Sequence, residues 1–208
     1  MKPACHAVLA AFLSLALPVS SHAAGAFGLE LGENIRTYAP EAHALVSRHD
    51  MQLFELVPPN ADPRFDIYAV DTHNGRIVRI MASSPDDRSP GGDATLAVLD
   101  GLKQELMARY GAPSLSMGEI ADAGDELLDH LVDEGGLEVL EWDMLEKQEA
   151  GLGAVYVFLA GAEDEKGLRA SYCTLYLESP DYAELSESAR LHEAEREKER
   201  EERDTAVQ

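Results

Sequence analysis

Three side chains with metal-binding chemistry recur at intervals of four residues: Glu126, His130 and Glu134. In a helix this spacing places all three on one face. An imidazole between two carboxylates can bind a divalent cation such as zinc. The competing interpretation is the solvated face of an acidic helix, the more common origin of this pattern in so acidic a chain. Glu126, His130 and Glu134 are therefore a candidate metal site whose remaining ligands the sequence does not assign.

Other patterns that would carry chemistry are missing from the sequence. It contains no Gly-x-Ser-x-Gly nucleophile motif, no phosphate-binding glycine loop and no Cys/His zinc spacing. Asp86, Asp87 and Asp93 lack the alternating spacing of a calcium loop, and Asp93 is interpreted as a helix cap. We predict no catalytic residue and no cofactor, which favours a non-enzymatic protein.

Acidic residues outnumber basic ones by 39 to 17, giving a net charge of −22. This charge repels phosphate backbones, so nucleic-acid binding is not expected. Cationic proteins and divalent ions remain open as partners, beside the simpler interpretation that the charge keeps the protein dissolved.

The first residues have the pattern of a secretory signal peptide. A basic start at Lys2 precedes an apolar block over 7–17, and Ser21 and Ala23 fit a small-x-small cleavage site. We predict a signal peptide over 1–23 with cleavage after Ala23, or alternatively after Ala26. The apolar block is too short to span a bilayer and no later segment approaches that length. A periplasmic or secreted protein without a membrane span is expected.

After cleavage Cys173 would be the one remaining cysteine, so no intramolecular disulfide is expected. We interpret Cys173 as a small buried residue on a strand, with an intermolecular bridge as the alternative.

Two helices are predicted to position these side chains. The candidate metal site lies on a helix over 122–134, and a second helix over 93–110 begins at Asp93 and ends before Gly111. Within the second helix, Glu105 and Arg109 are expected to form an i,i+4 ion pair. Each helix has an apolar stripe, formed by Leu127, Leu128, Leu131 and Val132 in the first and by Leu96, Leu99, Leu102, Leu106 and Tyr110 in the second.

Strands are predicted over 51–57, 154–160 and 168–178, and in a hairpin over 65–82. The segment over 137–143 fits a strand or a helix, and Val139 and Trp142 favour the strand. Asn74-Gly75 indicates a type I′ turn in that hairpin, which would place His73 opposite Arg76 and Asp71 opposite Val78. The expected fold is one α+β domain over 24–180, an antiparallel sheet of five or six strands with two packed amphipathic helices. A charged helical extension follows over 181–208.

Two resemblances rest on these segments. The hairpin over 65–78 resembles the repeat of exported PepSY-type domains, which are linked to peptidase inhibition or regulation. Residues 27–32, Phe-Gly-Leu-Glu-Leu-Gly, and the helix end over 106–113 are similar to small secreted bacterial α+β proteins without an assigned activity. The second resemblance implies the fold and no catalytic residues.

These observations favour an exported, non-enzymatic binding protein of the bacterial envelope that acts on a protein partner. The alternative is a metal-binding or hydrolytic periplasmic protein that uses His130 and its carboxylates. A third hypothesis treats the charged helix beyond Leu191 as a docking arm.

Overall fold

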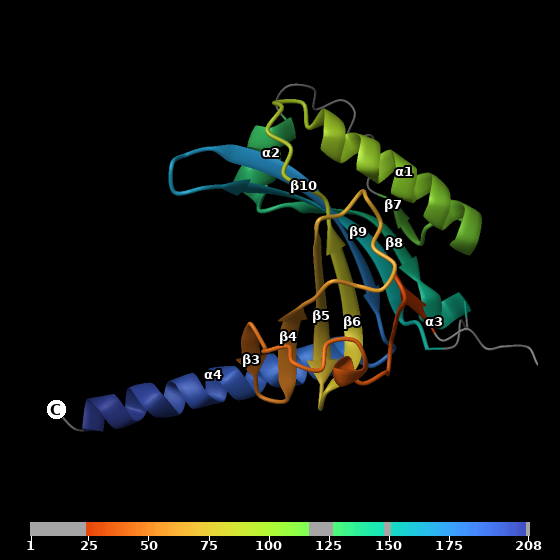
Figure 1. The fold of residues 1–208 in the computed structure, drawn as a ribbon. Coiled ribbons are helices and arrows are strands. Elements are labelled where there is room, and N and C mark those ends of the chain that lie inside the picture. The colour runs from red at the N-terminus through yellow and green to blue at the C-terminus, as the bar shows by residue number, and fades with distance from the viewer. Residues whose placement is uncertain (1–23, 117–126, 148–150, 207–208) are drawn as a thin grey trace, which may run out of the picture.

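The structure is a computed structural model that describes residues 24–116, 127–147 and 151–206. Its centre is an eight-stranded antiparallel sheet with the strand order β3-β4-β5-β6-β10-β9-β8-β7 (Figure 1). The strands are β3 (Val46–Arg48), β4 (Met51–Glu55), β5 (Ile67–His73), β6 (Arg76–Ser83), β10 (Arg169–Glu178), β9 (Ala154–Glu163), β8 (Leu137–Asp143) and β7 (Leu115–Ser116). Four short elements of the described chain lie outside this sheet: β1 (Gly25–Ala26) paired with β2 (Leu29–Glu30), a 3-10 turn η1 (Ile35–Thr37) and helix α3 (Met144–Lys147).

The antiparallel sheet and the mixed α and β content confirm the coarse fold prediction. The expected count of five or six strands is wrong, because the sheet has eight and a separate two-stranded sheet lies beside it. The additional strands of the large sheet, β3 and β7, are its edges and have three and two residues. Strands this short contain too little alternation for a sequence pattern to reveal them.

The β5–β6 hairpin has the predicted turn and a different register. Asn74 and Gly75 have φ values of 51° and 77°, and His73 faces Arg76 as expected. The register then shifts, because β6 has an extra residue at Val78, and Asp71 faces Arg79. The predicted pairing of Asp71 with Val78 is therefore wrong. A β-bulge changes which side chains are neighbours without changing the turn.

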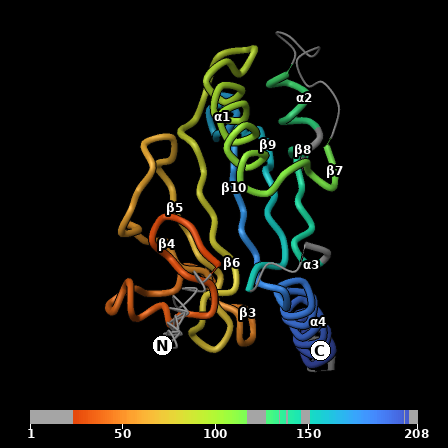
Figure 2. Tube along the Cα trace, turned by 90° about the vertical axis from the view of Figure 1, so that its right-hand side faces the viewer, coloured from red at the N-terminus to blue at the C-terminus, as the bar shows by residue number. Residues whose placement is uncertain are grey.

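The convex face of the sheet is covered by the N-terminal segment, α1 (Asp93–Tyr110) and α2 (Leu127–Glu134) (Figure 2). The predicted leucine stripe of α1 enters the core, and Leu127 and Leu131 of α2 are fully buried. Gly161 permits α2 to approach β9, because a Cβ atom there would lie 2.6 Å from the backbone nitrogen of Val132. The first residues of the predicted helix over 122–134, residues 122–126, lie outside the described residues. Cys173 is buried in β10, and this burial raises the pKa of its thiol to about 12.

Helix α1 begins with a different cap from the one predicted. The Asp87 carboxylate accepts hydrogen bonds from the backbone N–H groups of Ala94 and Thr95 at 2.7 and 3.2 Å. Gly92 occupies the cap position itself, and Asp93 is exposed in the first turn. The predicted Asp93 cap is therefore wrong: a loop residue further from the helix satisfies the free N–H groups.

Helix α4 (Tyr182–Ala206) crosses the concave side of the sheet at one end and then extends away from the body (Figure 1). Tyr182 and Ala189 are buried against Met51 and Val78. From Leu191 onward every described side chain is exposed. Among the described residues, no helix has both the length and the apolar character needed to cross a bilayer.

Candidate functional site on the concave face of the sheet

Three charged side chains from neighbouring central strands meet on the concave side of the sheet. The register places Arg79 of β6 opposite Asp71 of β5 on one side and Glu178 of β10 on the other. Arg79 Nη2 lies 2.6 Å from Asp71 Oδ2, and its Nη1 lies 3.7 Å from Glu178 Oε1. All three side chains are largely buried. Charges removed from water in this way require partners, and these residues provide them to one another.

Two aromatic rings enclose the Arg79 guanidinium. Its central carbon lies 4.5 Å from the ring centroid of Tyr182 and 5.3 Å from that of Tyr176, within the range of cation–π attraction. Burial opposes the positive charge, but the combined electrostatic attraction of Asp71, Tyr182, Tyr156 and Glu178 outweighs it, and the pKa of Arg79 lies above its usual value. The guanidinium therefore remains charged.

Tyrosine hydroxyls complete this network. Tyr182 Oη donates to Asp71 Oδ2 at 3.0 Å, and Tyr156 Oη donates to Glu178 Oε1 at 2.9 Å. Burial is the largest cause that raises the pKa of both hydroxyls, and the carboxylates of Glu178 and Asp71 raise it further against the opposing effect of Arg79. Both tyrosines are neutral donors near neutral pH. The network fixes the shape of the sheet floor at the point where α4 begins.

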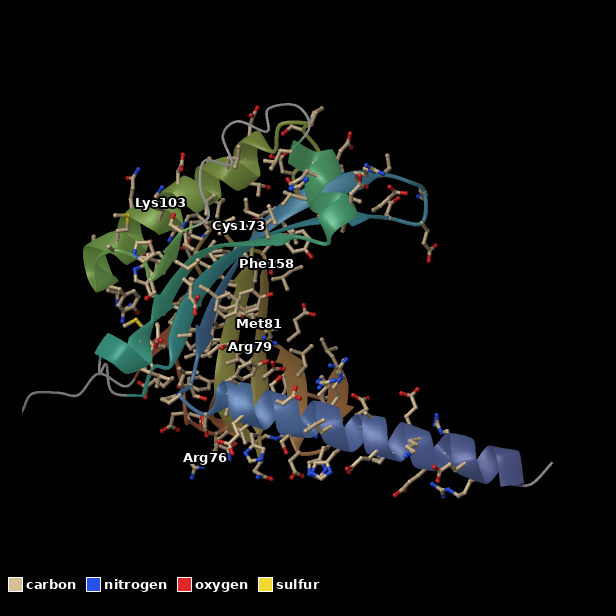
Figure 3. The ribbon with its side chains drawn as sticks, turned by 180° about the vertical axis from the view of Figure 1, so that it is seen from behind. Arg76, Arg79, Met81, Lys103, Phe158 and Cys173 are labelled. Atoms are coloured by element: carbon tan, nitrogen blue, oxygen red, sulfur yellow. The ribbon has the colours of Figure 1, made fainter. Side chains whose placement is uncertain are left out.

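Next to this network the concave side presents aromatic surface. Tyr156 and Tyr176 stack with ring centroids 4.6 Å apart and planes 13° apart, and Phe158 and Tyr172 occupy further positions on the same face of β9 and β10. These four rings are half-buried. Figure 3 shows Phe158, Met81 and Arg79 on the stretch of sheet between the β9–β10 hairpin and α4. We define the concave face as Asp71, Arg79, Met81, Tyr156, Phe158, Tyr172, Tyr176 and Glu178.

A cavity of about 270 Å³ lies where α4 crosses the strands, and it extends the concave face. Asp71 and Arg79 contribute to its floor. Its walls combine apolar side chains with arginines, including Val46, Arg48, Met51, Leu53 and Arg190.

Carboxylates surround the aromatic surface. Glu141 of β8 pairs in register with Tyr156 and is half-buried, and Glu55 of β4 is exposed. At the tip of the β9–β10 hairpin, Glu163, Asp164 and Glu165 precede a single Lys166, and all four are exposed. Part of the hairpin charge is balanced by Arg169, whose Nε lies 2.7 Å from Glu163 Oε2. The concave face and its margins therefore have an excess of negative charge.

His130 and Glu134, two of the three residues of the predicted metal site, lie elsewhere, on α2. His130 is exposed, and the neighbouring Asp129 accepts a hydrogen bond from Arg169 at 2.9 Å. Glu126 lies outside the described residues, and only the backbone of Glu134 is described. Within the described part of the chain, no group of three His, Cys, Asp or Glu side chains could hold a metal ion. The site at Glu126, His130 and Glu134 therefore stays a prediction.

Sequence reasoning did not identify the Asp71–Arg79–Glu178 network. The available signal was the occurrence of Asp71, Arg79 and Glu178 within otherwise apolar strands, together with Tyr172 and Tyr176 on one face of the last strand. Comparisons with protein-family models, with curated proteins and with solved structures find no match for the chain. The function must therefore be argued from the geometry.

Proposed function

We propose that the protein is a non-enzymatic binding protein of the bacterial envelope whose concave face binds a cationic, partly apolar segment of a partner protein. The observation that carries this proposal is the aromatic surface of Tyr156, Phe158, Tyr172 and Tyr176, which is only half-buried. Aromatic rings gathered next to one another on a sheet face that is partly open to water are typical of a surface that binds a partner. Large aromatic side chains also provide much of the binding energy in protein interfaces.

The charges around the concave face favour a cationic partner. Glu55, Glu141 and the hairpin tip add negative charge at the margins, and Arg79 at the centre is already paired with carboxylates. The net charge of −22 attracts a basic segment from a distance, and the aromatic surface then selects its apolar residues.

The state of the buried polar groups supports binding without catalysis. Asp71, Arg79 and Glu178 are engaged with one another, and the hydroxyls of Tyr156 and Tyr182 are donated to carboxylates. A general acid or base requires a pKa near the working pH, whereas the pKa values of Arg79, Tyr156 and Tyr182 are shifted away from it. These residues are suited to holding a rigid binding surface.

The proposal can be tested with two fluorescein-labelled peptides, one of alternating Lys and Leu and one of alternating Glu and Leu. Fluorescence anisotropy should detect binding of the Lys-Leu peptide only. Phe158→Ser should weaken that binding about tenfold, because it removes one half-buried ring from the surface without changing any charge. Phe158 is half-buried, and circular dichroism verifies that the variant is folded.

A matched pair of charge reversals separates the concave face from the general acidity of the protein. Glu141→Lys should weaken binding about fivefold, whereas Glu197→Lys, the same change of charge on the exposed part of α4, should stay within about twofold of the wild type. Equal effects of the two reversals, equal binding of both peptides, or an unaltered Phe158→Ser variant would each refute this site.

A further inference from the structure

A second cavity lies on the opposite, convex side of the sheet and has a volume of about 430 Å³. The C-terminal half of α1 forms one wall, and the N-terminal segment and the loop over 60–65 form the other. These elements lie next to each other in Figure 2. Core side chains form its floor and aromatic rings its sides: Leu102, Leu106, Leu175, Leu177, Phe27, Phe65 and Tyr110. The volume falls within the range of cavities that bind small molecules.

The aromatic wall is held in position by a constrained backbone. Phe27 has a φ of 57°, a left-handed conformation that is uncommon for a residue other than glycine. Its ring makes edge-on contacts with Phe65 at 5.6 Å and Tyr68 at 5.2 Å between centroids. The adjacent Gly28 has a φ of 77°, and a Cβ atom there would lie 2.8 Å from the Asn60 side chain. The N-terminal turn therefore places an aromatic ring against the cavity instead of burying it completely.

The charged side chains at the rim of this cavity differ in whether they form ion pairs. Arg64 Nη2 lies 2.6 Å from Asp62 Oδ2 and 2.7 Å from Glu105 Oε2, so both rim carboxylates are engaged with the same arginine. The expected Glu105–Arg109 pair is not formed, because Glu105 is directed to Arg64. Among the described residues, Arg109 makes no ion pair, and its guanidinium lies 4.9 Å from the ring of Tyr110. Arg109 is therefore the cation at the rim that is left to meet a ligand.

We propose that this cavity binds a single-chain amphipathic carboxylate, with the hydrocarbon chain against the leucine floor and the carboxylate on Arg109. The leucine floor offers no polar group to a ligand, so the buried part of the ligand must be apolar. An arginine binds a carboxylate through two parallel hydrogen bonds and favours this group over an alcohol or an ammonium ion. This ligand and this face are separate from the peptide-binding concave face, so either proposal can fail without the other.

Isothermal titration of the full-length protein with dodecanoate, dodecanol and dodecyltrimethylammonium tests the proposal. Dodecanoate should bind in a one-to-one complex below its micelle concentration and more tightly than the other two compounds. Octanoate and decanoate should bind progressively more weakly, by up to about fourfold per methylene removed, because the chain loses contact with the floor. This series tests the apolar floor without altering the protein.

Two variants of α1 then test the carboxylate contact. Arg109→Gln should weaken dodecanoate binding about tenfold and leave dodecanol binding unchanged. Lys103→Gln removes the same charge from an exposed position of the same helix that does not line the cavity (Figure 3), and it should stay within about twofold of the wild type. Phe158→Ser should likewise have no effect. The proposal is overturned if no one-to-one binding occurs, if the ammonium compound binds as tightly as dodecanoate, or if the two α1 variants behave alike.

Discussion

Arg79 combines interactions that are each weak in water and strong when buried. Its guanidinium is paired with Asp71, faces Glu178 and lies against the rings of Tyr176 and Tyr182. One hydrogen-bonding atom, Nε, is buried and has no hydrogen-bond partner among the described residues, which opposes part of this stabilisation. The cluster therefore defines the position of the three central strands relative to α4 more than it adds to stability.

The sequence could not reveal this cluster, because its formation depends on one extra residue. An unbroken hairpin register pairs Asp71 with Val78, which would leave Arg79 on the other face of the strand. The bulge at Val78 moves Arg79 opposite Asp71. The extra residue Val78 thus decides whether the buried charge of Arg79 has Asp71 as its partner. The pattern of hydrophobic residues in the sequence does not show where such an extra residue lies.

Removing the Arg79 charge should destabilise the protein strongly. In Arg79→Met the carboxylates of Asp71 and Glu178 remain buried without their cation, and the free energy of unfolding should fall by roughly 3 kcal/mol. Urea denaturation followed by circular dichroism measures the change. Arg169→Met is the matched control, since Arg169 also contacts several carboxylates but does so at the surface. The control should unfold at the wild-type urea concentration, and an equal loss in both variants would show that Arg79 has no special role.

At the scale of elements, the parts that the sequence predicts well are those with long, regular patterns. The helix over 93–110 and the 65–82 hairpin follow from a leucine stripe and from Asn74-Gly75. The edge strands β3 and β7 have only three and two residues, too few to show alternation, and the cap of α1 comes from the loop that precedes the helix. Asp93 has the sequence position that a cap usually has. The loop before the helix nevertheless places the Asp87 carboxylate at the helix end, where it accepts the hydrogen bonds of the free N–H groups.

Substitution of the two aspartates should distinguish the observed cap from the expected one. Asp87→Ala removes the acceptor for the backbone N–H groups of Ala94 and Thr95 and should lower the free energy of unfolding by about 1 kcal/mol. Asp93→Ala, in the exposed first turn, should have a clearly smaller effect. Thermal unfolding of both variants measures the difference, and a larger loss for Asp93→Ala would restore the cap predicted from sequence.

The same cap predicts a pH dependence. Burial raises the pKa of Asp87, but the hydrogen bonds from Ser89, Thr95 and Ala94 outweigh it and lower the pKa below the value of an unfolded chain, about 3.9. A lowered pKa stabilises the fold above the unfolded-state value, and this contribution is lost as the pH falls through the folded-state value. The difference in stability between the wild type and Asp87→Ala should therefore be complete near neutral pH and should shrink in strong acid.

On the scale of the whole molecule, the two faces of the sheet differ in what covers them. The convex face is closed by two helices and the N-terminal segment, whereas among the described elements α4 alone crosses the concave face, at one end (Figure 1). Further along, α4 contacts the β3–β4 turn. There the rings of His49 and His192 stack at 4.3 Å and Arg48 lies 3.5 Å from Glu193. Beyond this point every side chain that the structure describes on α4 is exposed, and most are charged, so this part of the helix has no apolar face to dock on a core.

Deleting residues 196–208 should therefore leave the melting temperature unchanged, because the deletion retains every contact described above for α4. The deletion removes five acidic and four basic residues, so the net charge changes only from −22 to −21. If the concave face binds the partner, the truncated protein should bind the Lys-Leu peptide within about twofold of the full chain, since the attracting field is almost the same. A loss of about tenfold or more at an unchanged melting temperature would instead identify the projecting helix as the docking arm. Because the deletion leaves the core intact and changes the net charge by only one unit, these two outcomes assign the binding role to one part of the molecule.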